Sequence, residues 1–381
     1  MKPQPFSISV AQETLDDLQQ RLAQTRWPDD IEGAGWDYGT NPGYLKELTT
    51  YWQHQYNWRK QEAMLNQFHH YKASIDGLGI HFIHEHGKGP KPLPILLTHG
   101  WPDSFFRMTK LIPLLTDPEA HGGKAKDAFD VVVPSIPGYG FSDRPTKKGF
   151  NAERVADLFA RLMTNSLGYN QFAAHGGDWG SSVTEQLAFN HANLLTGIHL
   201  TDIPYHHLFT VKPDDLSEAE QAYLNAGKTW QMSEGAYAMI QSTKPQTLAY
   251  GLNDSPVGLL AWIIEKFRSW SDSDGDVERR FTKDELLTNV MIYWVTQTIN
   301  SANRLYYESQ HNPSKNNVEH TNVPTGVAIF PKDLVLAPKA FAERFFNVQQ
   351  WTEMPSGGHF AALEEPELLA EDIRSFFRPL R

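Results

Sequence analysis

The sequence predicts an α/β fold in which a mostly parallel sheet is flanked by helices and interrupted by an inserted helical lid. Between Pro94 and Pro204, short runs of continuous apolar residues alternate with helical segments. This alternation is typical of parallel strands that are buried on both faces. From residue 205 to 320 the pattern becomes helical, and a strand pattern returns at Val323. The helical stretch is therefore predicted to be an insertion between two parts of one core.

Residues 1–90 are predicted to wrap around this core, because they offer little core of their own. A short amphipathic helix is indicated by Leu15, Leu18 and Leu22, and it should stop near Trp27 and Pro28. An aromatic-rich meander is expected to follow. Its aromatic residues are Trp36, Tyr38, Tyr44, Tyr51, Trp52, Tyr56 and Trp58.

Residues 91–204 should form the first part of the core, with strands over 95–98, 131–134, 172–175 and 198–200. One helix between the second and third of these strands ends at Gly168. Its apolar face carries Val155, Leu158, Phe159, Leu162 and Met163. Residues 205–320 form the predicted lid. Residues 321–381 complete the core with a strand over 323–330 and a final helix through Leu368, Leu369, Ile373, Phe376 and Phe377.

The composition indicates a soluble globular protein. The 381 residues carry a net charge of −11, spread along the chain, and include no cysteine. The spread of negative charge argues against nucleic acid or an anionic membrane as a partner. The lack of cysteine excludes disulfides and thiolate metal sites. No signal-peptide core and no run of about 18 apolar residues is present, so we expect a cytoplasmic protein without a membrane anchor.

The most informative motif is His-Gly-Gly-Asp-Trp-Gly over 175–180. It lies between a predicted strand and a predicted helix, which is the setting of a nucleophile elbow. Gly176 and Gly180 permit a sharp turn, and Asp178 stands where a hydrolase usually carries serine. A carboxylate can displace a leaving group at saturated carbon and form an alkyl ester. Asp178 is thus the predicted nucleophile, although the six residues alone would also suit a Gly-rich turn capped by aspartate.

Two further residues complete a triad in the order expected for the α/β-hydrolase fold, which is nucleophile, acid, histidine. Asp333 follows the strand over 323–330, and His359 precedes the final helix. His359, oriented by Asp333, would deprotonate the water that attacks the ester on Asp178. Either residue alone could belong to an ordinary turn, but the shared order and strand context favour the triad.

A candidate oxyanion hole follows from His-Gly-Trp-Pro over 99–102, directly after the strand 95–98. In this architecture one N–H group comes from that loop and another from the residue after the nucleophile. The donors would be the backbone N–H groups of Trp101 and Trp179. A turn in which Trp101 serves only for packing is the alternative.

Several segments resemble the microsomal-type epoxide hydrolases of the α/β-hydrolase fold, which include the juvenile hormone epoxide hydrolases. They are residues 99–102, 138–142, 177–180, 240–247, 251–259 and 357–364. The first three of these motifs also occur in haloalkane dehalogenases, whereas the lid stretches over 240–247 and 251–259 are specific. Mammalian members begin with a membrane-anchoring helix that has no counterpart here, so membrane association is not expected.

The resemblance implies an epoxide as substrate and two lid tyrosines as donors to the oxygen of the opening ring. Tyr237 matches the first tyrosine, and Tyr306 matches the second, with the adjacent Tyr307 as an alternative. The family often has glutamate at the position of Asp333, and the shorter aspartate could shift the histidine. No cofactor and no metal is implied. The side chains expected to contact a lipophilic epoxide are Trp101, Trp179 and Tyr307.

Two other functions stay open. A haloalkane dehalogenase-like hydrolase would use the same residues but bind a halide, and the two lid tyrosines favour the epoxide over it. A non-catalytic protein that binds a hydrophobic ligand would not need the triad. A serine esterase is excluded because the chain has no Gly-x-Ser-x-Gly, and a homodimer is compatible with the sequence. A metal site at His81, His84 and His86 is disfavoured, since these residues alternate like an exposed edge strand.

Overall fold

The computed structural model describes residues 2–212, 215–314 and 320–381, and its centre is a nine-stranded sheet in the order β1-β2-β3-β5-β4-β6-β7-β8-β9. The strands are β1 (Gln4–Phe6), β2 (His70–Ile75), β3 (Leu78–Glu85), β4 (Leu93–Thr98), β5 (Phe129–Pro134), β6 (Phe172–Gly176), β7 (Leu195–Leu200), β8 (Thr321–Ile329) and β9 (Phe346–Glu353). Pairing is antiparallel from β1 to β5 and parallel from β5 to β9. The predicted mostly parallel sheet is confirmed.

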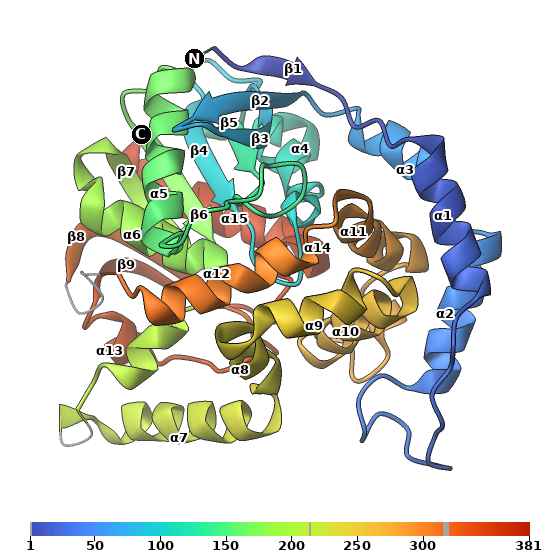
Figure 1. Cartoon of the computed structure of the whole chain (residues 1–381). Helices are drawn as coiled ribbons and strands as arrows, with labels where there is room; N and C mark the ends of the chain where they lie inside the picture. The colour runs from blue at the N-terminus through green and yellow to red at the C-terminus, as the bar shows by residue number, and fades with distance from the viewer. Residues whose placement is uncertain (1, 213–214, 315–319) are drawn as a thin grey trace.

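Helices cover both faces of the sheet (Figure 1), with α5 packed on α6 and α4 packed on α15. The helices are α1 (Gln12–Ala23), α2 (Pro42–His54), α3 (Trp58–Leu65), α4 (Leu111–Thr116), α5 (Ala152–Arg161), α6 (Trp179–Asn190), α7 (Glu218–Ser233), α8 (Ala236–Thr243), α9 (Pro245–Leu252), α10 (Pro256–Ser269), α11 (Lys283–Thr296), α12 (Ile299–His311), α13 (Lys339–Ala342), α14 (Ala361–Glu364) and α15 (Pro366–Phe377). In the described ranges, no helix combines the length and the apolar composition that a bilayer crossing requires.

The buried strands and the helix of the predicted first core segment lie where the apolar pattern placed them. The side chains of Val131, Val132 and Val133 are fully buried, because helices lie on both sides of β5. The five apolar residues predicted for one helix face are buried in α5 and in the π-helical turn Leu162–Ser166 that continues it.

The stretch predicted as an aromatic-rich meander contains the helices α2 and α3. Both begin at an asparagine cap, since Asn41 accepts a hydrogen bond from the Tyr44 N–H and Asn57 accepts one from the Lys60 N–H. These caps were a readable sequence signal. Residues 1–90 also contribute β1, β2 and β3 to the sheet, so this region shares the core.

The expectation of an exposed edge strand at His81, His84 and His86 is wrong. β3 lies between β2 and β5, and His81 is fully buried, with its Nδ1 2.9 Å from Ser135 Oγ. The physical reason is that β1 and β2 extend the sheet beyond β3. The last strand, β9, was not predicted, because its residues are mostly half-buried and polar at the opposite edge.

The predicted lid residues lie between β7 and β8 and are helical from the short 3-10 helix η6 (Tyr205–Phe209) to α12, with no strand in its described part. We call residues 2–66 the N-terminal strap. Figure 1 shows this strap running from the sheet along the outside of the lid, where α1 and α2 pack on α10, and α2 and α3 pack on α11. The Thr40 hydroxyl donates to the Ala261 carbonyl (2.8 Å), and the Tyr51 hydroxyl donates to Asp284 (2.9 Å). The strap therefore fastens one half of the lid.

Candidate active site

A cavity of about 530 Å³ lies between the lid and the core, within the size range of small-molecule sites. Its wall includes residues from β-strand ends, from α8 and from α12. Six of the sequence-predicted site residues line it, namely Asp178, Trp179, Tyr237, Tyr306, Asp333 and His359. The structure thus brings together side chains that are widely separated in the sequence.

Asp178 occupies the sharp turn between β6 and α6, with φ of 58° and ψ of −126°. Positive φ is uncommon for a residue with a side chain and is found at functional turns. The turn requires glycine nearby: a Cβ at Gly176 would lie 2.1 Å from the Gly180 carbonyl oxygen, and a Cβ at Gly180 would lie 2.1 Å from that of Thr98. The local sequence therefore has the geometry of a nucleophile elbow.

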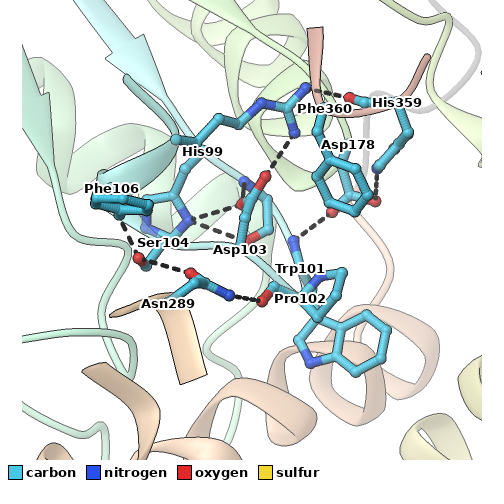
Figure 2. Close-up of polar contacts among 12 residues, drawn as sticks. His99, Trp101, Pro102, Asp103, Ser104, Phe106, Asp178, Asn289, His359 and Phe360 are labelled. Atoms are coloured by element: carbon cyan, nitrogen blue, oxygen red, sulfur yellow. Dashed lines mark hydrogen bonds and ion pairs between the residues drawn. The ribbon is translucent and has the colours of Figure 1, made fainter. Parts of the chain in front are cut away.

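The two predicted oxyanion donors flank Asp178. The Trp101 N–H donates to Asp178 Oδ1 at 2.7 Å (Figure 2). Trp179 is the first residue of α6, so its N–H has no acceptor within the helix, and the helix N-terminus favours negative charge. This arrangement can stabilise an oxyanion that forms on the carboxyl group of Asp178.

The indole of Trp101 is placed differently from the prediction. It is fully buried and stacks on the ring of Tyr237, with centroids 4.8 Å apart and an interplanar angle of 6°. It is absent from the cavity wall, whereas Trp179 lies on it. The lid covers the Trp101 ring, so this ring packs against the face of Tyr237 and helps to fix its orientation, but it does not reach the cavity.

His359 lies between the two aspartates. Its Nδ1 is 2.7 Å from Asp333 Oδ1, and its Nε2 is 3.4 Å from Asp178 Oδ2 (Figure 2 shows the latter pair). Burial lowers the pKa of His359, but the charges of Asp333 and Asp178 outweigh burial and raise it to about 10. His359 is therefore protonated at neutral pH.

The two predicted lid tyrosines meet over the cavity from different helices, Tyr237 from α8 and Tyr306 from α12. Their rings pack edge to face with centroids 5.9 Å apart, and Trp179 contacts Tyr306 in the same way at 4.9 Å. Burial raises the pKa of both phenols, and the charge of Asp178 raises it further. Both hydroxyls thus stay protonated and lie within electrostatic range of Asp178.

Tyr307, the alternative to Tyr306, points elsewhere. It stacks on His311 with centroids 3.9 Å apart and does not belong to the cavity wall. Neighbours on an α-helix point about 100° apart, so only one of the two tyrosines can face the cavity.

Asp202 is a site residue that the sequence interpretation missed. It follows β7, lines the cavity, and accepts hydrogen bonds from the Asp178 N–H and the Ser181 hydroxyl, both at 2.7 Å. Burial and the charge of Asp333 raise the pKa of Asp202 to about 7. Its position directly after the predicted strand 198–200 was an available signal, since polar residues at carboxyl ends of parallel strands commonly serve ligand sites.

Arg107 was also missed. Its fully buried guanidinium donates from Nη1 to Asp103 Oδ2 at 2.7 Å and from Nη2 to the His359 carbonyl at 2.5 Å. Asp103 Oδ1 in turn accepts the Gly100 N–H at 2.8 Å. Arg107 therefore ties the loop of the oxyanion donor to the loop of the histidine.

One group of metal-ligating side chains in the described part of the chain has its ligand atoms within 4.8 Å of one another. It consists of Glu185, His206 and His207, and His206 lies on the cavity wall. The histidines considered in the sequence, at 81, 84 and 86, do not form such a group there.

Comparisons with known proteins match the whole length of the chain. A family model described as the epoxide hydrolase N terminus matches residues 3–108, and a model of the alpha/beta hydrolase fold matches residues 94–366. A candidate epoxide hydrolase of Stigmatella aurantiaca is 46% identical over 378 residues, which cover 99% of this chain and 85% of that protein. Epoxide hydrolase 1 of Oryctolagus cuniculus is 40% identical over 400 residues, covering 98% and 88%.

Solved structures agree in fold. The crystal structure of juvenile hormone epoxide hydrolase from the silkworm Bombyx mori has a TM-score of 0.85 and 32% identity, covering 100% of this chain and 94% of that chain. The Aspergillus niger epoxide hydrolase has a TM-score of 0.86 and 31% identity, covering 100% and 97%. The likeness therefore includes the strap, the core and the lid together.

Proposed function

The chain belongs to the epoxide hydrolase family of the α/β-hydrolase fold, and from this premise we propose that it converts an epoxide and water into a vicinal diol through an ester on Asp178. The observation that carries the mechanism is the different setting of the two carboxylate oxygens. Oδ1 is held by the Trp101 N–H, whereas Oδ2 lies 3.4 Å from the protonated His359 on the cavity wall. Oδ2 is therefore the oxygen that attacks.

In the first step, Asp178 Oδ2 forms a bond to an epoxide carbon while the carbon–oxygen bond of the ring breaks. The oxygen that leaves the ring accepts hydrogen bonds from Tyr237 and Tyr306 and takes a proton from one of them. His359 restores that proton to the tyrosine and becomes neutral. The ester carries no charge, so one of the two carboxylates that raised the pKa of His359 is lost in this step.

In the second step, neutral His359 takes a proton from water, and the resulting hydroxide attacks the ester carbonyl. The N–H groups of Trp101 and Trp179 would stabilise the oxyanion. The ester then breaks, the diol oxygen takes a proton from His359, and the carboxylic acid of Asp178 returns its own proton to His359. The cycle ends with Asp178 ionised and His359 protonated, as it began.

The cavity wall favours a lipophilic epoxide. Apolar side chains such as Leu208, Met239, Leu334 and Val335 line it beside the aromatic rings. A second candidate is a dehalogenase-like reaction, which is favoured by one observation: the indole N–H group of Trp179, a residue on the cavity wall, is buried without a hydrogen-bond partner and could hold a halide. The two tyrosines favour the epoxide, because a halide needs no proton.

The test is single-turnover chemistry on the full chain with styrene oxide, a stilbene oxide, a terpenoid epoxide and a 1-haloalkane. His359→Gln should be alkylated and then stall, so its intact mass should rise by one epoxide. Asp178→Ala is the matched control and should stay unmodified. Wild type in heavy-oxygen water should carry the label in Asp178 after one turnover.

Label that appears first in the diol would mean direct attack by water and overturn the ester mechanism. Halide release from the haloalkane without diol formation from any epoxide would favour the second candidate. An unmodified His359→Gln under excess epoxide would mean that His359 acts before alkylation.

We also propose that the chain divides at residues 90, 204 and 320 into an N-terminal region, two core parts and the lid. The start of β4 at Leu93 and the insertion between β7 and β8 support these boundaries. The cytoplasmic location and the homodimer stay predictions, for cell fractionation and light scattering to test.

A further inference from the structure

A second group of ionisable side chains reaches the cavity beside the triad. Glu185 lies in α6, the helix that begins after the nucleophile, and His206 and His207 lie in η6, the first turn of the lid. Glu185 Oε1 contacts His207 Nε2, and Glu185 Oε2 lies 3.3 Å from His206 Nε2. The two imidazoles, from adjacent residues, thus face separate oxygens of one carboxylate.

The environment of this cluster differs from that of an ordinary ion pair on the protein surface. The side chains of Glu185 and His207 are fully buried, and that of His206 is 29% exposed. A carboxylate that is shielded from water in this way is normally paired with a positive charge or bound to a metal ion.

Two polar atoms aimed into the cluster lack a hydrogen-bond partner, namely Glu185 Oε2 and His206 Nε2. A buried polar atom without a partner needs an explanation, and a bound ion or an ordered water is among the usual ones. The separation of these two atoms, 3.3 Å, is already close to the distance of about 3.3–3.6 Å between neighbouring ligands of a tetrahedral ion with bonds of about 2.0–2.2 Å.

We propose that Glu185, His206 and His207 bind a divalent transition-metal ion such as Zn²⁺, with one coordination position open to the substrate cavity. Two imidazole nitrogens and one carboxylate oxygen suit Zn²⁺ and related ions, whereas Ca²⁺ and Mg²⁺ prefer oxygen ligands alone. Three protein ligands leave a fourth position, which falls on the cavity side because His206 lines that wall.

The ion would supply the charge that a buried Glu185 carboxylate lacks and would join α6 to the first turn of the lid. Because it binds the folded chain, it would raise stability with increasing metal concentration. This inference does not depend on the proposed epoxide chemistry, since none of its residues belongs to the triad or to the tyrosine pair.

The test uses metal-free full-length protein titrated with Co²⁺ and Zn²⁺. We expect one equivalent of Co²⁺ to bind with visible d–d absorption of a nitrogen and oxygen site, and Zn²⁺ to displace it and raise Tm. His206→Ala and Glu185→Gln should each weaken binding at least tenfold. His54→Ala removes an exposed imidazole and should bind like wild type.

Less than one equivalent of bound Co²⁺ in wild type would overturn the proposal, and so would wild-type affinity in His206→Ala. Because His206 is partly exposed, this variant keeps the test decisive if Glu185→Gln does not fold. Loss of binding in His359→Gln, together with its retention in His206→Ala, would place the ion at the triad and also refute the site.

Discussion

Two groups of carboxylates and histidines lie beside one cavity, yet the pKa of their imidazoles shifts in opposite directions. In the triad, Asp178 and Asp333 raise the pKa of His359 to about 10. In the second cluster, a single Glu185 faces two imidazoles, and the pKa of His206 falls to about 4. Burial lowers the imidazole pKa in both places. Between these two groups, the ratio of carboxylates to histidines accounts for the opposite directions of the imidazole pKa.

The largest effect is expected from removing one carboxylate of the triad. Asp333→Asn should slow ester hydrolysis by roughly 10²–10⁴-fold, the usual contribution of a general base, and slow alkylation less. The pKa of His359, followed by NMR, should fall in this variant. Asp333→Glu is the conservative control and should keep the raised pKa. If the pKa of His359 stays unchanged in Asp333→Asn, the ratio of carboxylates to histidines is not the cause of the difference.

The next prediction compares tyrosine hydroxyl groups on the cavity wall by their effect on the rate of alkylation. The charge of Asp178 contributes to the pKa of Tyr237 and Tyr306. Phenylalanine at either position should slow alkylation by roughly 10²–10³-fold, since one hydrogen bond to a developing alkoxide contributes about 2–4 kcal/mol. Tyr205→Phe is the matched control, because Tyr205 also lines the cavity with a buried hydroxyl that has no partner.

Stopped-flow tryptophan fluorescence can follow alkylation in all three tyrosine variants, with Trp179 on the cavity wall as a reporter. Tyr205→Phe should stay within about threefold of wild type, because no bond to the alkoxide is lost. Equal rates in wild type and in both Tyr237→Phe and Tyr306→Phe would remove the epoxide mechanism and promote the dehalogenase.

A smaller effect is expected at Asp202, which supports the elbow. As the pH falls through about 7, Asp202 gains a proton and loses acceptor capacity toward the Asp178 N–H and the Ser181 hydroxyl. Wild-type kcat should therefore fall in this window. Asp202→Asn keeps an acceptor for one of the two bonds and should be slower by about tenfold, the cost of one hydrogen bond of about 1.4 kcal/mol, without that pH step. If kcat of Asp202→Asn still falls as the pH drops through about 7, another group is responsible for that fall.

The last effect concerns the stability of the fold rather than the rate of a catalytic step. The folded-state pKa of Glu185 is raised from 4.5 to about 8, so its stability contribution is complete below pH 4.5 and is lost as the pH rises through 8. With chelator present, wild type should lose more free energy of unfolding than Glu185→Gln between pH 5 and 8.5, by about 1–3 kcal/mol. Urea denaturation at both pH values measures this. The His359 contribution is present in both proteins and cancels, so equal losses would contradict the prediction.

The sequence was sufficient for features that depend on neighbouring residues. The parallel strands and the elbow around Asp178 follow from local apolar runs and closely spaced glycines, and the order of Asp333 and His359 follows from the strand context. β9 escaped prediction because an edge strand with half-buried polar residues lacks an apolar pattern.

Features that depend on contacts between distant segments could not be predicted. Arg107 binds the carbonyl of a residue 252 positions away, and no local pattern indicates that pairing. The position of the Trp101 ring behind Tyr237 depends on how the lid packs. Glu364 was visible in a recognised motif, but only the fold reveals that it accepts the N–H groups of Gly358 and Phe360 around the histidine.

The N-terminal strap has a consequence for which part of the lid could move to open the cavity. It fastens α10 and α11, whereas α7 and α8 carry exposed apolar side chains such as Met232 (88% exposed) and Met239 (57%). Widening of the entrance would therefore fall on α7, because α8 packs on α12 and Tyr237 stacks on the buried Trp101 of the core. Closure of α7 around a substrate would then expel water from above a donor pair that is already in place, so the element that opens the cavity is separate from the groups that protonate the substrate.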